Sequence, residues 1–320
     1  MSRYITELCP GMEPLILPRD ITGEKKKNVN LVALGDVGAT LLTGLCLLGA
    51  DVIDNIGIFD MNKDVIRRYE MEMGQVGWPF GSRTVPAVNG IEEADLFDCD
   101  MLVFCASKAV PPIGASGDVR MAQFQANREI IAHYGRLAKA ANFKGVFAVV
   151  SDPVDPLCKE FLLTSGLSPA QVRGYGLGVM NKRAEYFARK DPDFSRYLSE
   201  GRAYGPHGQD LVIANSVVNY DDSLSRRLTD LTINANLEVR ELGFKPYIAP
   251  AISSGAIPLL LTLTGDWNYS SVYLGKGPEG AFLGIKNRIK KGAVEIENLP
   301  LPEKLYGRIL KAYRNLCLIN

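Results

Sequence analysis

Hydrophobic residues in the first part of this chain form short continuous apolar runs, and the segments between these runs have helical periodicity. The runs predict strands at residues 29–34, 55–59, 101–106 and 145–150, and the periodic segments predict helices at 40–48, 64–73 and 120–142. Strands that are apolar along their whole length and alternate with helices are typical of a parallel sheet covered on both faces. We therefore expect a doubly wound α/β sheet in residues 28–175.

After about residue 176 the pattern changes. Strands are predicted at 211–218 and 271–274 without helical crossovers between close neighbours, and long helices at 224–242 and 302–316. This arrangement indicates a second, α+β domain over residues 176–320.

Residues 1–27 have no clear periodicity and end in the charge run Glu-Lys-Lys-Lys at 24–27. A charge run of this kind is usually a solvated segment. We therefore expect residues 1–27 to form a solvated arm ahead of the first strand.

Composition and charge exclude several classes of protein. Lysine plus arginine equals aspartate plus glutamate at 36 each, which gives no electrostatic reason to expect a nucleic acid or an anionic membrane as partner. No apolar run approaches the roughly 18 residues that span a bilayer, and the N-terminus carries Glu7, Pro10 and Glu13 instead of a signal peptide. We expect a cytoplasmic protein.

Cysteines and histidines are too scattered to predict a metal site. The six cysteines form no C-x-x-C pair, and the chain has only two histidines, whereas a zinc site needs these residues clustered. We expect free, mostly buried thiols in a reducing compartment and no bound metal.

A glycine-containing turn, Ala33-Leu34-Gly35-Asp36-Val37-Gly38, joins the first predicted strand to the first predicted helix. It matches G-x-G-x-x-G with alanine at the first position, and such a turn brings backbone amides at a helix N-terminus to a pyrophosphate. A side chain at Gly35 would collide with the cofactor, and Gly38 allows close packing of helix on strand. We expect Ala33 to tolerate the turn by keeping a negative φ.

Asp60 ends the second predicted strand, about 20 residues after Gly38, where an acid holds the ribose hydroxyls of a dinucleotide. Its charge would repel a 2′-phosphate, which favours NAD over NADP. The alternative is that Asp60 only caps the helix that begins near Asn62. The combination of strand, turn, helix, strand and acid favours dinucleotide binding.

Four further segments resemble the lactate/malate dehydrogenase family in order and spacing. They are R-M-A-Q-F-Q-A-N at 120–127, V-S-D-P-V-D at 150–155, G-V-M-N-K-R at 178–183 and G-P-H-G at 205–208. The resemblance runs from about Val29 to the C-terminus. It implies a Rossmann-type NAD-binding domain at 28–175, a catalytic α+β domain at 176–320, and a homodimer or homotetramer.

The resemblance also implies roles for individual residues in oxidising a small 2-hydroxy acid to a 2-oxo acid. His207 would be the acid/base, because an imidazole exchanges protons near neutral pH. Arg183 would clamp the substrate carboxylate with two parallel hydrogen bonds. Arg120 would swing in with a mobile loop and polarise the substrate carbonyl. His133 has no such setting and is interpreted as structural.

Further cofactor contacts follow from the same resemblance. Besides Ala33, Gly35, Asp36, Val37, Gly38 and Asp60, they are expected from Ala106, Asn127 and Val150.

Two positions depart from the family pattern. Met180 stands where the family has the aspartate that pairs with the catalytic histidine, and Asp152 stands where it has asparagine. We hypothesise that Asp152 has taken over as partner of His207. Asp152 is therefore expected to be both a catalytic and a substrate-binding residue. Two alternatives are that Asn181 orients the imidazole by a hydrogen bond, and that Asp152 meets a cationic group on an unusual substrate.

The loop between Ser107 and Arg120 is longer than the resemblance predicts and lacks the family's usual basic stretch. Val110 or Lys108 stands where malate-type enzymes place an arginine, and Gly114, Ser116 and Gly117 favour a mobile lid. Val110 and the apolar stretch 248–251 favour a lactate-like substrate over malate.

Three functions remain open from the sequence. The first is an active NAD-dependent 2-hydroxy-acid dehydrogenase, which the joint presence of His207, Arg120 and Arg183 favours. The second is a catalytically impaired NAD-binding member that acts as a sensor or assembly partner, which Met180 makes credible. The third, an NAD-using glycosidase, is disfavoured because it needs metal ligands that this chain lacks in sequence.

Overall fold

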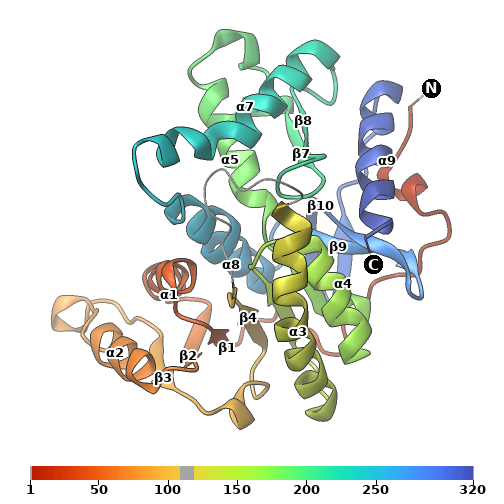
Figure 1. Cartoon of the computed structure of the whole chain (residues 1–320). Coiled ribbons are helices and arrows are strands. Elements are labelled where there is room, and N and C mark those ends of the chain that lie inside the picture. The colour runs from red at the N-terminus through yellow and green to blue at the C-terminus, as the bar shows by residue number, and fades with distance from the viewer. Residues whose placement is uncertain (1, 109–118, 320) are drawn as a thin grey trace.

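The computed structural model of the chain, shown in Figure 1, describes residues 2–108 and 119–319, except for the side chains of residues 119–121. Within these residues nine strands form one sheet in the order β11-β10-β9-β6-β5-β4-β1-β2-β3. The sheet is parallel from β3 to β6 and antiparallel from β6 to β11. The strands are β1 Lys27–Val32, β2 Ile53–Phe59, β3 Ala87–Gly90, β4 Met101–Phe104, β5 Val146–Val149, β6 Val172–Gly174, β9 Asn268–Lys276, β10 Glu279–Lys290 and β11 Ala293–Ile296.

Helices cover both faces of this sheet, which confirms the doubly wound α/β class (Figure 1). On one face α1 and α8 bury apolar side chains against Val29 and Leu31, and on the other α3 and α4 pack over Phe104 and Phe147. The longer helices are α1 Asp36–Leu48, α2 Lys63–Met73, α3 Val119–Ala140, α4 Val154–Ser165, α5 Leu177–Ala188, α7 Asp222–Glu241, α8 Ile257–Thr264 and α9 Glu303–Cys317. A π-helical segment, η6 Pro250–Ala256, leads into α8 and packs against α1.

The sheet continues past residue 175. The strands β9, β10 and β11 lie beyond that point and add antiparallel neighbours to β6, so that Gly174 pairs with Ser271. The division of the chain at 175/176 stays a prediction. A separate pair, β7 Arg202–Tyr204 with β8 Val212–Ala214, is antiparallel and lies beside α5 and the short helix α6 Tyr197–Glu200.

The prediction of a solvated N-terminal arm is wrong. Ile5 and Ile21 are each 1% exposed and belong to the main hydrophobic core, together with Leu8, Leu15 and Leu17. Backbone bridges tie the arm to the C-terminal part of the chain, and both ends of the chain lie beside α9 (Figure 1). Spacing between its apolar residues is irregular because the arm is extended or forms a short 3-10 turn, so periodicity does not reveal its burial.

Candidate functional site

The dinucleotide turn lies between β1 and α1, where the parallel strands end. Ala33 has a φ of 72°, in the left-handed region, so the expected negative φ is wrong. An alanine there is strained, because its Cβ approaches the following backbone. The left-handed turn brings the Ala33 carbonyl so close to α1 that a Cβ on Gly38 would lie 2.0 Å from its oxygen. Gly38 therefore cannot carry a side chain without a shift of the backbone.

The turn has room for a pyrophosphate. Gly35 is the N-cap of α1 and has no side chain to occupy the free amides of the first turn, and a Cβ built on it meets nothing within 4 Å. Uncapped amides at a helix N-terminus attract an anion. Asp36, the first residue of α1, is ion-paired with Lys245, with 3.1 Å between Oδ2 and Nζ. The contacts predicted for Asp36 and Val37 with the cofactor stay predictions.

Asp60 follows β2 and holds the turn. Its Oδ2 accepts a hydrogen bond from the Leu34 amide at 2.9 Å, and its Oδ1 accepts one from the Asn62 amide at 3.0 Å. The N-cap of α2 is Asn62, which accepts from the Asp64 amide, so Asp60 does not cap this helix. A carboxylate oxygen can accept more than one hydrogen bond, so Asp60 keeps acceptor capacity for ribose hydroxyls.

Asn127 on α3 ties together the ends of β4 and β5. Its buried amide donates to the Asp152 carbonyl at 3.1 Å and to Ser107 Oγ at 3.3 Å, and its Oδ1 accepts from the Lys108 amide at 2.8 Å. Ser151 Oγ donates to the Ala106 carbonyl at 2.7 Å and adds a second link. The side chain predicted to touch the cofactor thus also fixes the strand ends beside it.

His207 and Asp152 form a pair. The imidazole Nδ1 lies 3.0 Å from Asp152 Oδ1, and the two side chains are 19% and 43% exposed. An ionised carboxylate only accepts hydrogen bonds, so Nδ1 carries the proton in this pair and Nε2 is the basic nitrogen when the ring is neutral. The structure brings together the two residues that the sequence hypothesis paired.

Met180 and Asn181 take no part in this contact. Met180 is 2% exposed and belongs to the apolar cluster around α5. Asn181 donates to Glu185 Oε1 at 2.8 Å and accepts from the Tyr197 hydroxyl at 2.9 Å. The Asn181 amide binds Glu185 and Tyr197 while the imidazole contacts Asp152, so the structure does not support the alternative in which Asn181 orients the ring.

Arg183 lies one turn after Met180 on α5, near the same carboxylate. Burial lowers the pKa of Arg183, and the Asp152 charge opposes that shift. A guanidinium remains charged under these conditions, so the site holds a fixed cation beside the His–Asp pair. Its Nη1 contacts Met180 Sδ at 3.6 Å. The site thus keeps the cation that a substrate carboxylate requires.

Arg120 belongs to the first turn of α3, but its side chain lies outside the described residues. Val110, Gly114, Ser116 and Gly117 lie outside them as well. The roles of Arg120 and of the loop stay predictions.

Glycines and a close packing contact shape the loop that carries His207. Gly205 and Gly208 have φ values of 93° and 130°, which other residues adopt only with strain. Gly176 lets the loop approach α5, because a Cβ on it would lie 2.9 Å from His207 Cβ. The sequence gave no sign of this contact between Gly176 and the loop.

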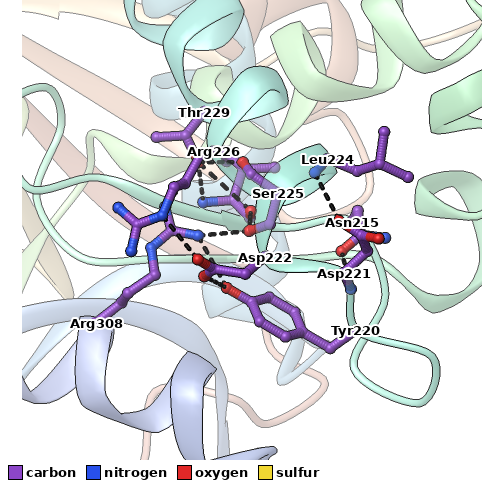
Figure 2. A network of polar contacts seen from close by, with 10 residues as sticks. Asn215, Tyr220, Asp221, Asp222, Leu224, Ser225, Arg226, Thr229 and Arg308 are labelled. Carbon is purple, nitrogen blue, oxygen red and sulfur yellow. Dashed lines mark hydrogen bonds and ion pairs between the residues drawn. The ribbon is translucent and has the colours of Figure 1, made fainter.

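A polar network on α7 and α9 holds the strand that follows this loop (Figure 2). Thr229 Oγ1 accepts from the Ile213 amide of β8 at 3.0 Å, and Ser225 Oγ donates to the Ile213 carbonyl. Arg308 donates to both hydroxyls, at 2.6 Å to Ser225 and 3.1 Å to Thr229, and also to Tyr220. β8, which follows the His207 loop in the chain, is thereby tied to α7 and α9.

Ser254 on η6 is a positioning residue that sequence reasoning missed. It is 2% exposed, donates to the Gly176 carbonyl at 2.7 Å and accepts from the Val179 amide at 2.8 Å. These bonds fix the start of α5, the helix that carries Arg183. Nothing in the local sequence distinguishes this serine from a solvated one.

A cavity of about 230 Å³ adjoins His207. Its walls come from the start of α4, the loop at 206–210 and the end of α9. His207 is part of its lining, whereas Asp152 and Arg183 are not.

The described residues contain neither a metal-binding cluster nor a helix that could span a membrane. No cluster of three or more His, Cys, Asp or Glu residues in this part of the chain has the geometry to hold a metal ion. None of the helices described is long and apolar enough to cross a membrane.

A Rossmann-type sheet whose first turn and second strand carry this geometry defines a dinucleotide-binding α/β protein. Residues 27–174 match the family model of the lactate/malate dehydrogenase NAD binding domain. The chain is 25% identical over 317 residues to the L-lactate dehydrogenase of Staphylococcus saprophyticus, which covers 91% of this chain and 96% of that protein. The chain is thus similar to lactate and malate dehydrogenases over most of its length, and the model matched by residues 27–174 indicates NAD as the cofactor.

Solved structures show the same fold. The minor L-lactate dehydrogenase of Enterococcus mundtii, in a ligands-bound form, has a TM-score of 0.76 at 21% identity over 92% of this chain and 97% of that one. The malate dehydrogenase of Archaeoglobus fulgidus in complex with NADH has a TM-score of 0.71 at 20% identity over 90% and 97%.

Proposed function

We propose that this protein is an active NAD-dependent dehydrogenase of small 2-hydroxy acids in which Asp152 is the partner of the catalytic His207. The contact of 3.0 Å between His207 Nδ1 and Asp152 Oδ1 carries the proposal. It gives the histidine a charged partner in spite of Met180. A member that had lost its chemistry would have no reason to keep such a pair beside a half-buried arginine.

The pair accounts for the proton transfer. When bound, NAD supplies the hydride acceptor. His207 takes the hydroxyl proton of the 2-hydroxy acid at Nε2, and Asp152 stabilises the imidazolium through Nδ1–H. In the reverse direction the same nitrogen returns the proton to the 2-oxo acid.

Arg183 accounts for orientation of the substrate. Its guanidinium binds the substrate carboxylate. The bound carboxylate also supplies a counter-charge that offsets the unfavourable burial of the cation. By the family resemblance, Arg120 supplies a second positive charge that polarises the substrate carbonyl.

We propose a lactate-like acid over malate, because Val110 and the stretch 248–251 are apolar. A malate-like substrate would instead require Lys108 as the second cation. Ala251 is fully buried, and Ile248 is exposed at 64%.

NADH oxidation by the purified protein tests this function directly. A panel of pyruvate, oxaloacetate and longer aliphatic, aromatic and amino-bearing 2-oxo acids would be followed by loss of near-ultraviolet absorbance. We expect turnover with at least one monocarboxylic 2-oxo acid. His207→Asn should lower kcat by about 10²–10⁴ while leaving NADH affinity within about twofold.

The panel also distinguishes the alternatives. Preference for oxaloacetate would contradict the lactate-like assignment. NADH binding without turnover of any panel member would favour the non-catalytic sensor, and Met180 would be the cause. A preference for amino-bearing acids would indicate that Asp152 meets a substrate cation.

A further inference from the structure

The dinucleotide turn contains an unfavourable charge. Asp36 places a carboxylate on the first residue of α1, and Asp60 places a second one at the turn, whereas residues 33–38 contain no basic residue. A pyrophosphate brings two further negative charges to the same amides. The helix N-terminus offers only about half a positive charge to offset them.

A cation from the other half of the chain lies at this point. Lys245 belongs to the segment between α7 and η6, and its Nζ is 3.1 Å from Asp36 Oδ2. Its side chain is 82% exposed and that of Asp36 is 51% exposed, so both can rearrange without unpacking the core. Within residues 2–108 and 119–319, this is the one ion pair found for the turn.

Close packing determines where Lys245 is held. The segment runs directly into η6, which lies against α1: a Cβ on Gly44 would come within 2.8 Å of Ile252, and one on Gly255 within 2.6 Å of Leu41. Helices that approach this closely are fixed relative to each other. The base of the lysine is therefore tethered near the N-terminus of α1.

From this geometry we infer that Lys245 neutralises the NAD pyrophosphate, moving from Asp36 to the phosphates when the cofactor binds. Asp36 holds the lysine in place in the free protein. Because this role concerns NAD binding alone, it does not depend on which acid is oxidised or on the His–Asp pair.

Ligands with different numbers of phosphates test the inference on the whole protein. Adenosine, ADP, ADP-ribose and NADH would be titrated by calorimetry, or in competition with NADH fluorescence, at low and high salt. Lys245→Met should weaken ADP, ADP-ribose and NADH about five- to tenfold at low salt, less at high salt, and leave adenosine unchanged. Lys304→Met, an equal charge change on the distant helix α9, is the control and should change none of them.

Two results would overturn the inference. One is equal behaviour of Lys245→Met and Lys304→Met, and the other is an equal loss for adenosine and the phosphate-bearing ligands. Asp36→Asn should tighten ADP-ribose a few-fold, and in that background Lys245→Met should still weaken it. Disappearance of the loss there would show that the lysine only offsets Asp36. Since an exposed ion pair contributes little to stability, unchanged melting temperatures would confirm that the variants fold.

Discussion

The dinucleotide turn and the His207–Asp152 pair both depart from the family pattern, but the departures are of different kinds. In the turn, alanine stands where the motif has glycine, and its backbone is in the left-handed region that favours glycine, with a φ of 72°. In the His207–Asp152 pair, the carboxylate stands on a different element from the one that the resemblance predicts. Met180 lies in the apolar cluster of α5, and Asp152 contacts His207 from the end of β5. A site built from backbone amides depends on the conformation of the backbone. A site built from a side-chain charge depends on the position of that charge, which residues on different elements can supply.

The largest effect is expected when the relocated charge is removed. Asp152→Asn preserves the shape but not the charge, so it should lower kcat by about 10²–10⁴ with little change in NADH affinity. Addition of Met180→Asp should restore part of the loss by returning a carboxylate to α5. Measurement of kcat for the wild type, both single variants and the double variant decides this. Equal losses in Asp152→Asn with and without Met180→Asp would contradict the compensation.

An intermediate effect is expected when the backbone of the turn is crowded. Gly38→Ala places a Cβ 2.0 Å from the Ala33 carbonyl oxygen, so it should destabilise the protein by about 1–3 kcal/mol and weaken NADH binding about tenfold. Gly35→Ala is the matched control, because its Cβ meets no protein atom within 4 Å. It should leave the melting temperature unchanged and weaken NADH alone. Loss of stability in Gly35→Ala would show that the space above the turn is not reserved for ligand.

The smallest effect is expected when strain in the turn is relieved. Ala33→Gly removes about 1–2 kcal/mol of left-handed strain and costs about 0.5–1 kcal/mol in unfolded-state entropy, so the net stabilisation is about 0–1.5 kcal/mol. The melting temperature should rise by about 1–2 °C. Ala39→Gly in α1 makes the same chemical change without strain to relieve and should lower it. A fall in both variants would contradict a strained Ala33.

The sequence predicted the parallel strands β1, β2, β4 and β5 because they are continuous apolar runs, but it missed the short parallel strands β3 and β6. It missed α4, since Pro153 and Pro156 at the start of Val154–Ser165 look like a turn, although proline is tolerated in the first turn of a helix. It also missed most of β10 and the burial of the N-terminal arm, both of which depend on partners far away in the chain.

The parts of the site that belong to recognisable sequence motifs could be predicted. The parts that depend on contacts between residues far apart in the sequence could not. Two simultaneous departures, at 152 and 180, led to the correct expectation that Asp152 contacts His207. The bonds of Ser254 to the start of α5 left no trace in the sequence, because a buried serine and an exposed one look alike there. The φ of Ala33 was expected to be negative because alanine avoids the left-handed region, yet close packing of α1 on the turn imposes it.

The position of Asp152 has a consequence for recombination with relatives. His207 lies after residue 175 and its carboxylate partner before it, whereas the family resemblance places both on the later side. A chimera joined at 175/176 with the later half of a relative would bring two carboxylates to one imidazole. The reciprocal chimera would bring none. The two exchanges therefore have different outcomes for the imidazole. A functional chimera would have to take the residues at positions 152 and 180 from the same parent.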